Sequence, residues 1–164
     1  MSRRAHHRAP VMKTLFPSLK LIIALAAGLT AAVAPVRAAG PRVVEITAND
    51  QMKFSLATFE AKEGEELKVV LTNQGTLPKE AMGHNWVLLK AGVDLAAFAT
   101  AAMTAKDTDY VPAAKKGDVI ASIPVLGPKK SGEAIFKAPA AGSYTYICSF
   151  PGHYMIMKGT LTVK

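Results

Sequence analysis

Short segments with alternating apolar and polar residues limit the folds open to this chain more than any other feature. The clearest are Lys68-Val69-Val70-Leu71-Thr72 and Ser143-Tyr144-Thr145-Tyr146-Ile147-Cys148. Such alternation places apolar side chains on one face of a strand. Turn residues separate the segments, at Asn73-Gln74-Gly75, Gly127-Pro128 and Ala141-Gly142. The pattern predicts strands at 43–47, 54–59, 67–72, 85–89, 119–123, 134–136, 143–148 and 159–163.

One segment interrupts this series of strands. Residues 93–103 are rich in alanine, begin near Asp94 and carry Leu95, Phe98 and Met103 at roughly helical spacing. The sequence therefore predicts one short helix in a connection between strands. Strands of this length around a single helical insertion predict an all-β fold, an antiparallel Greek-key β-sandwich.

The N-terminal segment has the composition of an export signal. A basic start is followed by an apolar stretch over 19–34 and by Val36-Arg37-Ala38, which fits the small-x-small rule for cleavage. We therefore predict a cleaved secretory signal over 1–38 and a mature domain over 39–164. A membrane anchor is the alternative, but it would need about 20 apolar residues, and this stretch is shorter and closes on proline and arginine.

Removal of this segment changes the charge of the chain. Residues 1–38 hold six of the 20 basic residues and none of the 12 acidic residues, so a net charge of +8 becomes +2 in the mature chain. The remaining basic residues are scattered and adjoin each other only at Lys115-Lys116 and Lys129-Lys130. This distribution gives little support for nucleic-acid binding, which uses a concentrated basic surface.

The mature chain holds few residues that bind soft metals. His6 and His7 leave with the signal, so only His84 and His153 remain beside the single Cys148. That cysteine has no partner for an intrachain disulfide, and a free thiol in an oxidising compartment is a liability unless a metal occupies it. Together with a methionine, these residues offer one thiolate, two imidazoles and one thioether, the ligand set of a trigonal copper site with a long axial methionine.

The spacing of these residues suits one metal ion. His153 follows Cys148 by five residues and Met157 follows His153 by four. A tight loop around Pro151-Gly152 can therefore place three ligands around one ion, and His84 at the start of a neighbouring strand supplies the fourth. Each residue taken singly also has a structural interpretation, because cysteine and methionine are common core residues and a histidine can occupy a turn.

Five longer motifs extend this pattern. They are Asn49-Asp50-Gln51-Met52-Lys53-Phe54, Leu77-Pro78-Lys79, Met82-Gly83-His84-Asn85-Trp86-Val87-Leu88, Cys148-Ser149-Phe150-Pro151-Gly152-His153 and Met157-Lys158-Gly159-Thr160-Leu161. Together they resemble the azurins, bacterial periplasmic blue copper proteins of the cupredoxin fold. The resemblance covers essentially the whole mature chain. The ligand spacings disfavour the plastocyanin and pseudoazurin branches, whose loops between cysteine and histidine are shorter.

The resemblance implies a periplasmic electron carrier with one type 1 copper ion that cycles between Cu(I) and Cu(II). His84, Cys148 and His153 would be the equatorial ligands and Met157 the weak axial ligand. Gly83 would offer its carbonyl oxygen as a distant fifth ligand. We expect a monomer, and no enzyme, because all the strong ligands would be on one metal with no open position for a substrate.

Around these ligands, the resemblance implies two supporting residues and a docking surface. Asn85 and Phe150 would each direct a backbone N–H toward the Cys148 sulfur, and the Asn85 side chain would brace the ligand loop. Redox proteins such as c-type cytochromes or periplasmic reductases would dock transiently at an exposed apolar patch, with His153 as the electron port. No stable membrane association is expected after cleavage of the signal. The patch would consist of Met52, Leu77, Met82, Pro151, Gly152, Met155 and Ile156.

Two features depart from the azurin pattern. The chain has no cysteines for the disulfide that azurins typically carry near the N-terminus, so we expect a less stable apo form. Asn73 stands where azurins often have a histidine. With no free histidine left, we expect the reduction potential to change little between about pH 5 and 8.

A periplasmic copper chaperone or storage protein is the alternative function. Such a protein would have exposed, exchangeable ligands, often several methionines or histidines in a row, and the mature sequence has no such run. Rapid copper loss to a mild chelator without a reversible redox couple would favour this alternative. Zinc could occupy the same ligands, although Met157 would then have little purpose.

Overall fold

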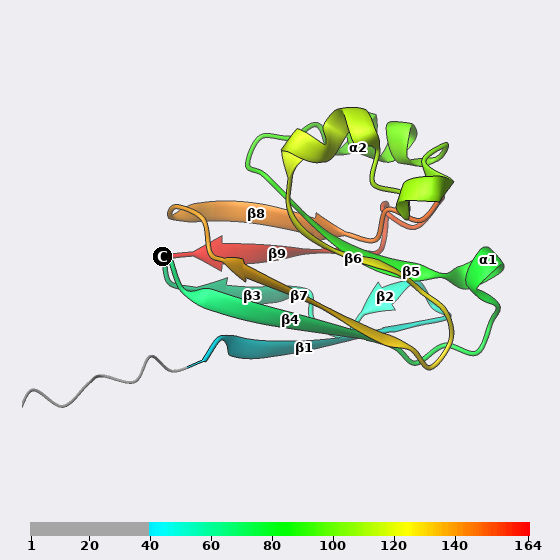
Figure 1. Cartoon of the computed structure of the whole chain (residues 1–164), viewed down its shortest axis with the longest axis horizontal. Coiled ribbons are helices and arrows are strands. Elements are labelled where there is room, and N and C mark those ends of the chain that lie inside the picture. The colour runs from blue at the N-terminus through cyan, green and yellow to red at the C-terminus, as the bar shows by residue number, and fades with distance from the viewer. Residues whose placement is uncertain (1–39) are drawn as a thin grey trace, which may run out of the picture. The chain divides into compact units, whose positions relative to one another are not determined.

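The computed structural model describes residues 40–164, so the predicted signal over 1–38 lies outside the described residues. Within this range, strands β1 to β9 form two sheets around one apolar core (Figure 1). The first sheet has the order β2-β1-β4-β7, with β1 (Arg42–Asn49), β2 (Lys53–Phe54), β4 (Glu66–Asn73) and β7 (Ser131–Lys137). The second has the order β3-β9-β8-β5-β6, with β3 (Thr58–Ala61), β5 (His84–Leu89), β6 (Val119–Leu126), β8 (Gly142–Ile147) and β9 (Lys158–Val163). The predicted all-β sandwich is confirmed.

Strand β4 shows how the alternating sequence pattern builds the core. Leu67, Val69 and Leu71 are completely buried, whereas the residues between them are only half-buried. Side chains of the second sheet, such as Trp86 and Leu161, belong to the same buried cluster. Removing this apolar surface from water is the main stabilising contribution to the sandwich.

Strand β5 is buried along its whole length because a helix covers its outer face. Helix α2 (Leu95–Ala102) inserts Phe98 between Val87, Leu89 and Ile147, and these four side chains form a second buried cluster. The carboxylate of Asp94 accepts the Ala97 N–H at 3.0 Å and so caps the helix. The predicted helix is confirmed, and Figure 1 shows it above β8.

Three further short helical elements were not expected from the sequence. They are α1 (Lys79–Met82) and the 3-10 helices Lys106–Thr108 and Ala113–Asp118. None of the helices within residues 40–164 is long and apolar enough to cross a membrane.

The prediction of one strand over 54–59 is wrong. The chain forms β2 and β3 there, and these strands belong to different sheets, since β2 pairs with β1 and β3 pairs with β9. Residues 55–57 bend between them. Phe54 and Leu56 both pack against the core, so the alternation continues through the bend and hides the change of sheet.

The prediction of purely antiparallel sheets is also wrong. β1 runs parallel to β4, with Val44 opposite Val69, and β3 runs parallel to β9, with Thr58 opposite Thr160. Between β1 and β4 the chain visits the second sheet through β3, and such a crossover permits parallel pairing. The pairs β1·β2, β4·β7, β5·β6, β5·β8 and β8·β9 are antiparallel.

Candidate metal centre

Three of the predicted ligands lie in one loop between neighbouring strands. Cys148 is the first residue after β8, and Met157 is the last before β9. Since β8 and β9 are antiparallel neighbours, the segment 148–157 closes a hairpin whose two ends are held by the sheet. Gly152 has a φ of 84°, a conformation that favours glycine, and it turns the chain just before His153.

Backbone hydrogen bonds fix the shape of this loop. The Cys148 N–H donates to the Met157 carbonyl at 3.0 Å, which extends the β8–β9 pairing into the loop. The His153 N–H donates to the Phe150 carbonyl at 3.0 Å, and the Met157 N–H donates to the His153 carbonyl at 2.9 Å. Each predicted ligand in the loop is therefore tied to another part of it.

The fourth predicted ligand, His84, comes from the adjacent strand. It is the first residue of β5, which lies beside β8 in the second sheet. The two strands are antiparallel, with Val87 opposite Ile147. The start of β5 therefore lies next to the end of β8 and the cysteine that follows it.

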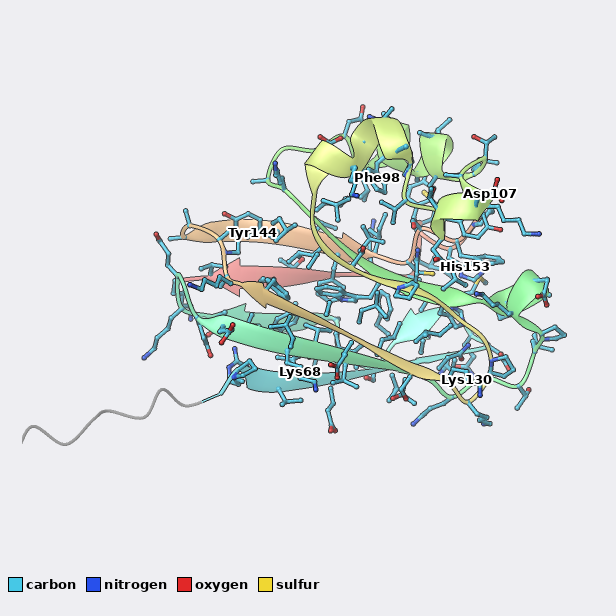
Figure 2. All side chains as sticks on the ribbon, in the orientation of Figure 1. Lys68, Phe98, Asp107, Lys130, Tyr144 and His153 are labelled. Atoms are coloured by element: carbon cyan, nitrogen blue, oxygen red, sulfur yellow. The ribbon has the colours of Figure 1, made fainter. Side chains whose placement is uncertain are left out.

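The thiol and the two imidazoles converge in a buried cluster at this end of the sandwich. The Cys148 Sγ lies 3.4 Å from Nδ1 of His153 and 3.9 Å from Nδ1 of His84. Each of the three residues offers a donor atom within 4.8 Å of the others. Cys148 and His84 are inaccessible to solvent, and His153 is 3% exposed. Figure 2 shows His153 beyond the end of β8.

Burial shifts the protonation of all three groups. It raises the pKa of Cys148 to about 12, while the backbone N–H groups of Asn85 and Phe150 act on the sulfur in the opposite sense. Burial, together with a smaller effect of the neighbouring His84, lowers the pKa of His153 to about 4. Burial also lowers the pKa of His84. At neutral pH both imidazoles are therefore neutral and can donate a lone pair to a cation, which would also displace the thiol proton.

This donor set fits a soft metal cation. Two neutral imidazoles turn Nδ1 toward one sulfur, and no carboxylate from residues 40–164 belongs to the cluster. Met157 is fully buried and belongs to the same group of packed residues as Cys148. Two imidazoles, one thiolate and a weakly bound thioether are the ligands of a copper site that transfers electrons.

Asn85 connects the two segments that carry the ligands. Its Nδ2 donates to Ser149 Oγ and to the Asp109 carbonyl, each at 2.8 Å, and its Oδ1 accepts the Ser149 N–H at 2.8 Å. The Ser149 hydroxyl donates in turn to the Tyr110 carbonyl at 2.7 Å. Asn85 and Ser149 each follow a predicted ligand directly, so these bonds hold β5 and the hairpin loop together.

Sequence reasoning missed Ser149, Asp109 and Tyr110. Asp109 and Tyr110 have φ values of 52° and 60°, a left-handed conformation that costs about 1 to 3 kcal/mol for each residue. The Asp109 carboxylate also accepts the Val125 N–H at 3.1 Å. No sequence signal could have identified Asp109 and Tyr110 as supporting residues, because they contact Asn85 and Ser149 through their backbone carbonyls.

Gly83 and Phe150 pack closely beside the ligands. A Cβ atom at Gly83 would lie 2.5 Å from Cγ1 of Val125 and 2.6 Å from the Lys79 carbonyl oxygen, so no side chain fits there. The Phe150 ring packs on the His153 ring with a centroid separation of 4.8 Å. Protein atoms therefore pack tightly next to His84, at Gly83, and next to His153, at Phe150.

The residues predicted for docking differ in exposure. Met155 and Ile156 are 62% and 58% exposed and share the hairpin loop with His153. His153 itself is almost covered, so the predicted electron port offers only a small part of its ring to solvent. Leu77 and Gly152 are exposed, whereas Met52, Met82 and Pro151 are half-buried.

Comparison with known proteins gives a consistent result. The family model described as copper binding proteins, plastocyanin/azurin family, matches residues 42–164. Azurin from Pseudomonas denitrificans is 42% identical over 128 residues, which cover 74% of this chain and 97% of that protein.

Solved structures give the same picture. Auracyanin A from Chloroflexus aurantiacus, described as a "blue" copper protein, is 34% identical with a TM-score of 0.70, and the match covers 76% of this chain and 100% of that one. The azurin Az-iso2 from Methylomonas sp. strain J is also 34% identical, with a TM-score of 0.67 and coverage of 75% and 98%.

Proposed function

Since this chain belongs to the plastocyanin/azurin family of copper-binding proteins, we propose that it carries single electrons between redox proteins. The observation that carries this proposal is the buried cluster in which His84, Cys148 and His153 each offer a donor atom within 4.8 Å of the others. Family membership and this cluster also confirm the predicted cofactor, one type 1 copper ion per chain.

In this proposal the residues keep the roles expected from the sequence. His84, Cys148 and His153 are the strong ligands, Met157 is the weak axial ligand, and Gly83 offers its carbonyl oxygen as a distant fifth. When bound, copper supplies a one-electron couple between Cu(I) and Cu(II). The fully buried positions of Cys148 and Met157 support these roles, because they keep water away from the sulfur atoms.

The rest of the protein limits movement of the ligands. The hydrogen bonds of Asn85 join the start of β5, which carries His84, to Ser149 in the hairpin loop and to the Asp109 carbonyl. The backbone N–H groups of Asn85 and Phe150 act on the Cys148 sulfur and favour its thiolate form. A site that keeps its shape in both oxidation states needs little rearrangement for each electron, and hydrogen bonds at the sulfur tune the potential.

We further propose that the protein works in the periplasm and meets its partners at the predicted apolar patch. The relatives named above include azurins, and the family resemblance implies a periplasmic location for them. Met155 and Ile156 support the docking site, because they are large, exposed and apolar and lie in the loop of His153. Met155→Lys should slow electron exchange with a c-type cytochrome, whereas an unchanged rate would place the docking site elsewhere.

An absorption spectrum of the copper-loaded protein tests the proposed function. We expect an intense thiolate-to-copper charge-transfer band in the visible region and a reversible redox couple. Cys148→Ser should abolish the band, and Glu45→Gln, a change at an exposed strand residue of the first sheet, should leave it intact. A wild-type protein that binds copper without this band would contradict the proposal. Rapid copper loss to a mild chelator without a redox couple would support a chaperone or storage protein instead.

A further inference from the structure

We propose that a groove beside the metal centre binds a small neutral aromatic reductant of the hydroquinone class, whose electrons reach the site through the Phe150 ring. The inference rests on the proposed function and deepens it, because it adds a class of electron donor and a second route into the same site. The groove has a volume of about 180 Å³, and none of the residues that line it belongs to the predicted apolar patch.

The apolar wall of the groove consists of residues that support the metal centre. Phe150 lines the groove and packs on His153, with a centroid separation of 4.8 Å. Tyr110 lines it beside Phe150, with the two rings 5.0 Å apart at an angle of 65°, and its carbonyl accepts the Ser149 hydroxyl at 2.7 Å. Val125 completes this wall. A molecule that packs on Phe150 is therefore separated from a predicted ligand by one aromatic ring.

The size of the groove suits a single ring. Pockets that hold drug-sized molecules measure about 300 to 1,000 Å³, whereas a cavity of about 150 Å³ holds one benzene molecule. Aromatic rings pack on one another at centroid separations of about 4.5 to 7 Å. Two of the three apolar side chains in the groove are aromatic, Tyr110 and Phe150, so this wall fits the face or edge of one more ring.

The polar part of the groove favours a neutral molecule with hydroxyl groups. It has two ammonium and two carboxylate groups, from Lys79, Lys106, Glu80 and Asp109, and therefore no net charge. Nζ of Lys79 lies 3.9 Å from Oδ1 of Asp109, so these two charges partly compensate each other. An anion would be attracted by the lysines and repelled by the carboxylates, and a cation the reverse. A phenolic hydroxyl both donates and accepts hydrogen bonds, so it can use either kind of group.

A hydroquinone combines these features with an available electron. His153 is 3% exposed, so a small donor in solution touches little of the ligand itself. Electronic coupling falls steeply with distance, and the contact of Phe150 with His153 gives a donor in the groove a short route through packed rings. Oxidation of one hydroquinone to the quinone releases two electrons and two protons. It therefore reduces two protein molecules from Cu(II) to Cu(I), and both protons pass to water.

Binding can be tested without electron transfer. Resorcinol, the meta isomer of hydroquinone, has the same ring and hydroxyl groups but is much harder to oxidise. Added to the copper-free protein, it should shift the amide NMR signals of Tyr110, Val125 and Phe150, with a dissociation constant in the millimolar range, as expected for so small a ligand. In Tyr110→Ala the constant should increase about threefold to tenfold, the effect of one aromatic contact.

The control for this titration is Tyr110→Phe, which keeps the ring and should keep the wild-type dissociation constant. The wild-type shifts decide the result even if Tyr110→Ala does not fold. Shifts confined to Met155 and Ile156, or no shifts at all, would overturn the groove as a binding site. This titration does not depend on copper, so its outcome is separate from any failure of the proposed function.

The electron route can be tested with copper bound. The rate at which hydroquinone reduces the Cu(II) protein should level off as its concentration increases, and resorcinol should slow the reaction. Tyr110→Ala should lower the rate at low concentration about threefold to tenfold, whereas Glu45→Gln, at an exposed position of β1, should leave it unchanged. Reduction by a c-type cytochrome serves as the comparison, because a change in the potential alone would slow both reductants. An equal loss with both, or a hydroquinone rate that never levels off and ignores resorcinol, would overturn the route.

Discussion

The hydrogen bonds of Asn85 give the most direct test of how this site is held together. Asn85→Leu replaces a completely buried amide by an apolar side chain of similar size. It removes the two bonds donated by Nδ2, to Ser149 Oγ and the Asp109 carbonyl, and the one bond accepted by Oδ1 from the Ser149 N–H. The backbone N–H of Asn85 near the cysteine sulfur remains, so the change affects the brace and spares that contact.

The expected magnitude follows from these three bonds. Each buried hydrogen bond contributes about 1 kcal/mol, and a buried partner left unsatisfied costs about 1 to 3 kcal/mol. The Ser149 N–H and the Asp109 carbonyl lose their partner, whereas the Ser149 hydroxyl still donates to the Tyr110 carbonyl. We therefore expect the free energy of unfolding of the apo protein to fall by about 3 to 5 kcal/mol.

A matched control is offered by Asn73, another buried asparagine. Its Nδ2 donates to the Leu126 carbonyl at 3.1 Å and its Oδ1 accepts the Gly75 N–H at 2.8 Å, but it follows no predicted ligand. Asn73→Leu should cost about 2 to 3 kcal/mol, in proportion to two bonds. Guanidinium chloride unfolding of both apo variants measures the two losses. The rate of copper transfer to a chelator then shows which of the two substitutions weakens copper binding.

If the hydrogen bonds of Asn85 hold the ligand segments, the two variants should differ in their effect on the copper site. Asn85→Leu should release copper faster and alter the charge-transfer band, and Asn73→Leu should do neither. If Asn85→Leu costs less than about 1 kcal/mol, or releases copper no faster than the control variant, the hydrogen bonds do not hold the ligand segments as argued above.

Three further predictions concern packing and pH. Gly83→Ala should lower the free energy of unfolding by about 1 to 3 kcal/mol or more, because the new methyl group would collide with Val125 and the Lys79 carbonyl; an unchanged denaturation midpoint would contradict this packing. Burial lowers the pKa of His153 from 6.5 to about 4, so the unfolded chain takes up its proton first on acidification. The contribution of the neutral His153 to the stability of the apo protein should therefore be fully present above about pH 6.5 and be lost as the pH drops toward about 4. A urea midpoint that increased as the pH was lowered over this interval would be inconsistent with a neutral buried imidazole. The reduction potential should change little between about pH 5 and 8, since the Asn73 amide does not titrate; voltammetry would reveal a marked slope if another group were coupled to the copper.

The sequence located those site residues that lie close together along the chain or that belong to a rare residue type. Cys148, His153 and Met157 lie in one hairpin loop, so their spacing along the chain reflects their spacing in space. His84 was assigned because only two histidines remain once the predicted signal is removed, and the structure places it beside the thiol. The Asp109 and Tyr110 carbonyls that bind Asn85 and Ser149 come from a distant segment, and no spacing rule predicts such contacts.

The errors in the fold have a similar cause. Alternation identifies which face of a strand is buried but does not identify the sheet that it joins. Phe54 and Leu56 both pack against the core, so the alternation continues past the end of β2, and 54–59 looks like one strand although the chain changes sheets within it. Parallel pairing of β1 with β4 depends likewise on the path of the chain through the other sheet, which local residue patterns do not record.

The parallel pair of β3 and β9 and the β8–β9 hairpin are expected to form at different stages of folding. Thr58 meets Thr160 in this pair, so almost the whole chain must be present before the contact forms. Closing so long a loop is entropically unfavourable, and such contacts form slowly. β9 begins directly after Met157 and pairs with β8 in a local hairpin, so the loop with Cys148, His153 and Met157 can close before β9 meets β3. The three ligand positions of this loop are therefore expected to come together early in folding, and the edge pair of β3 and β9 is expected to form late.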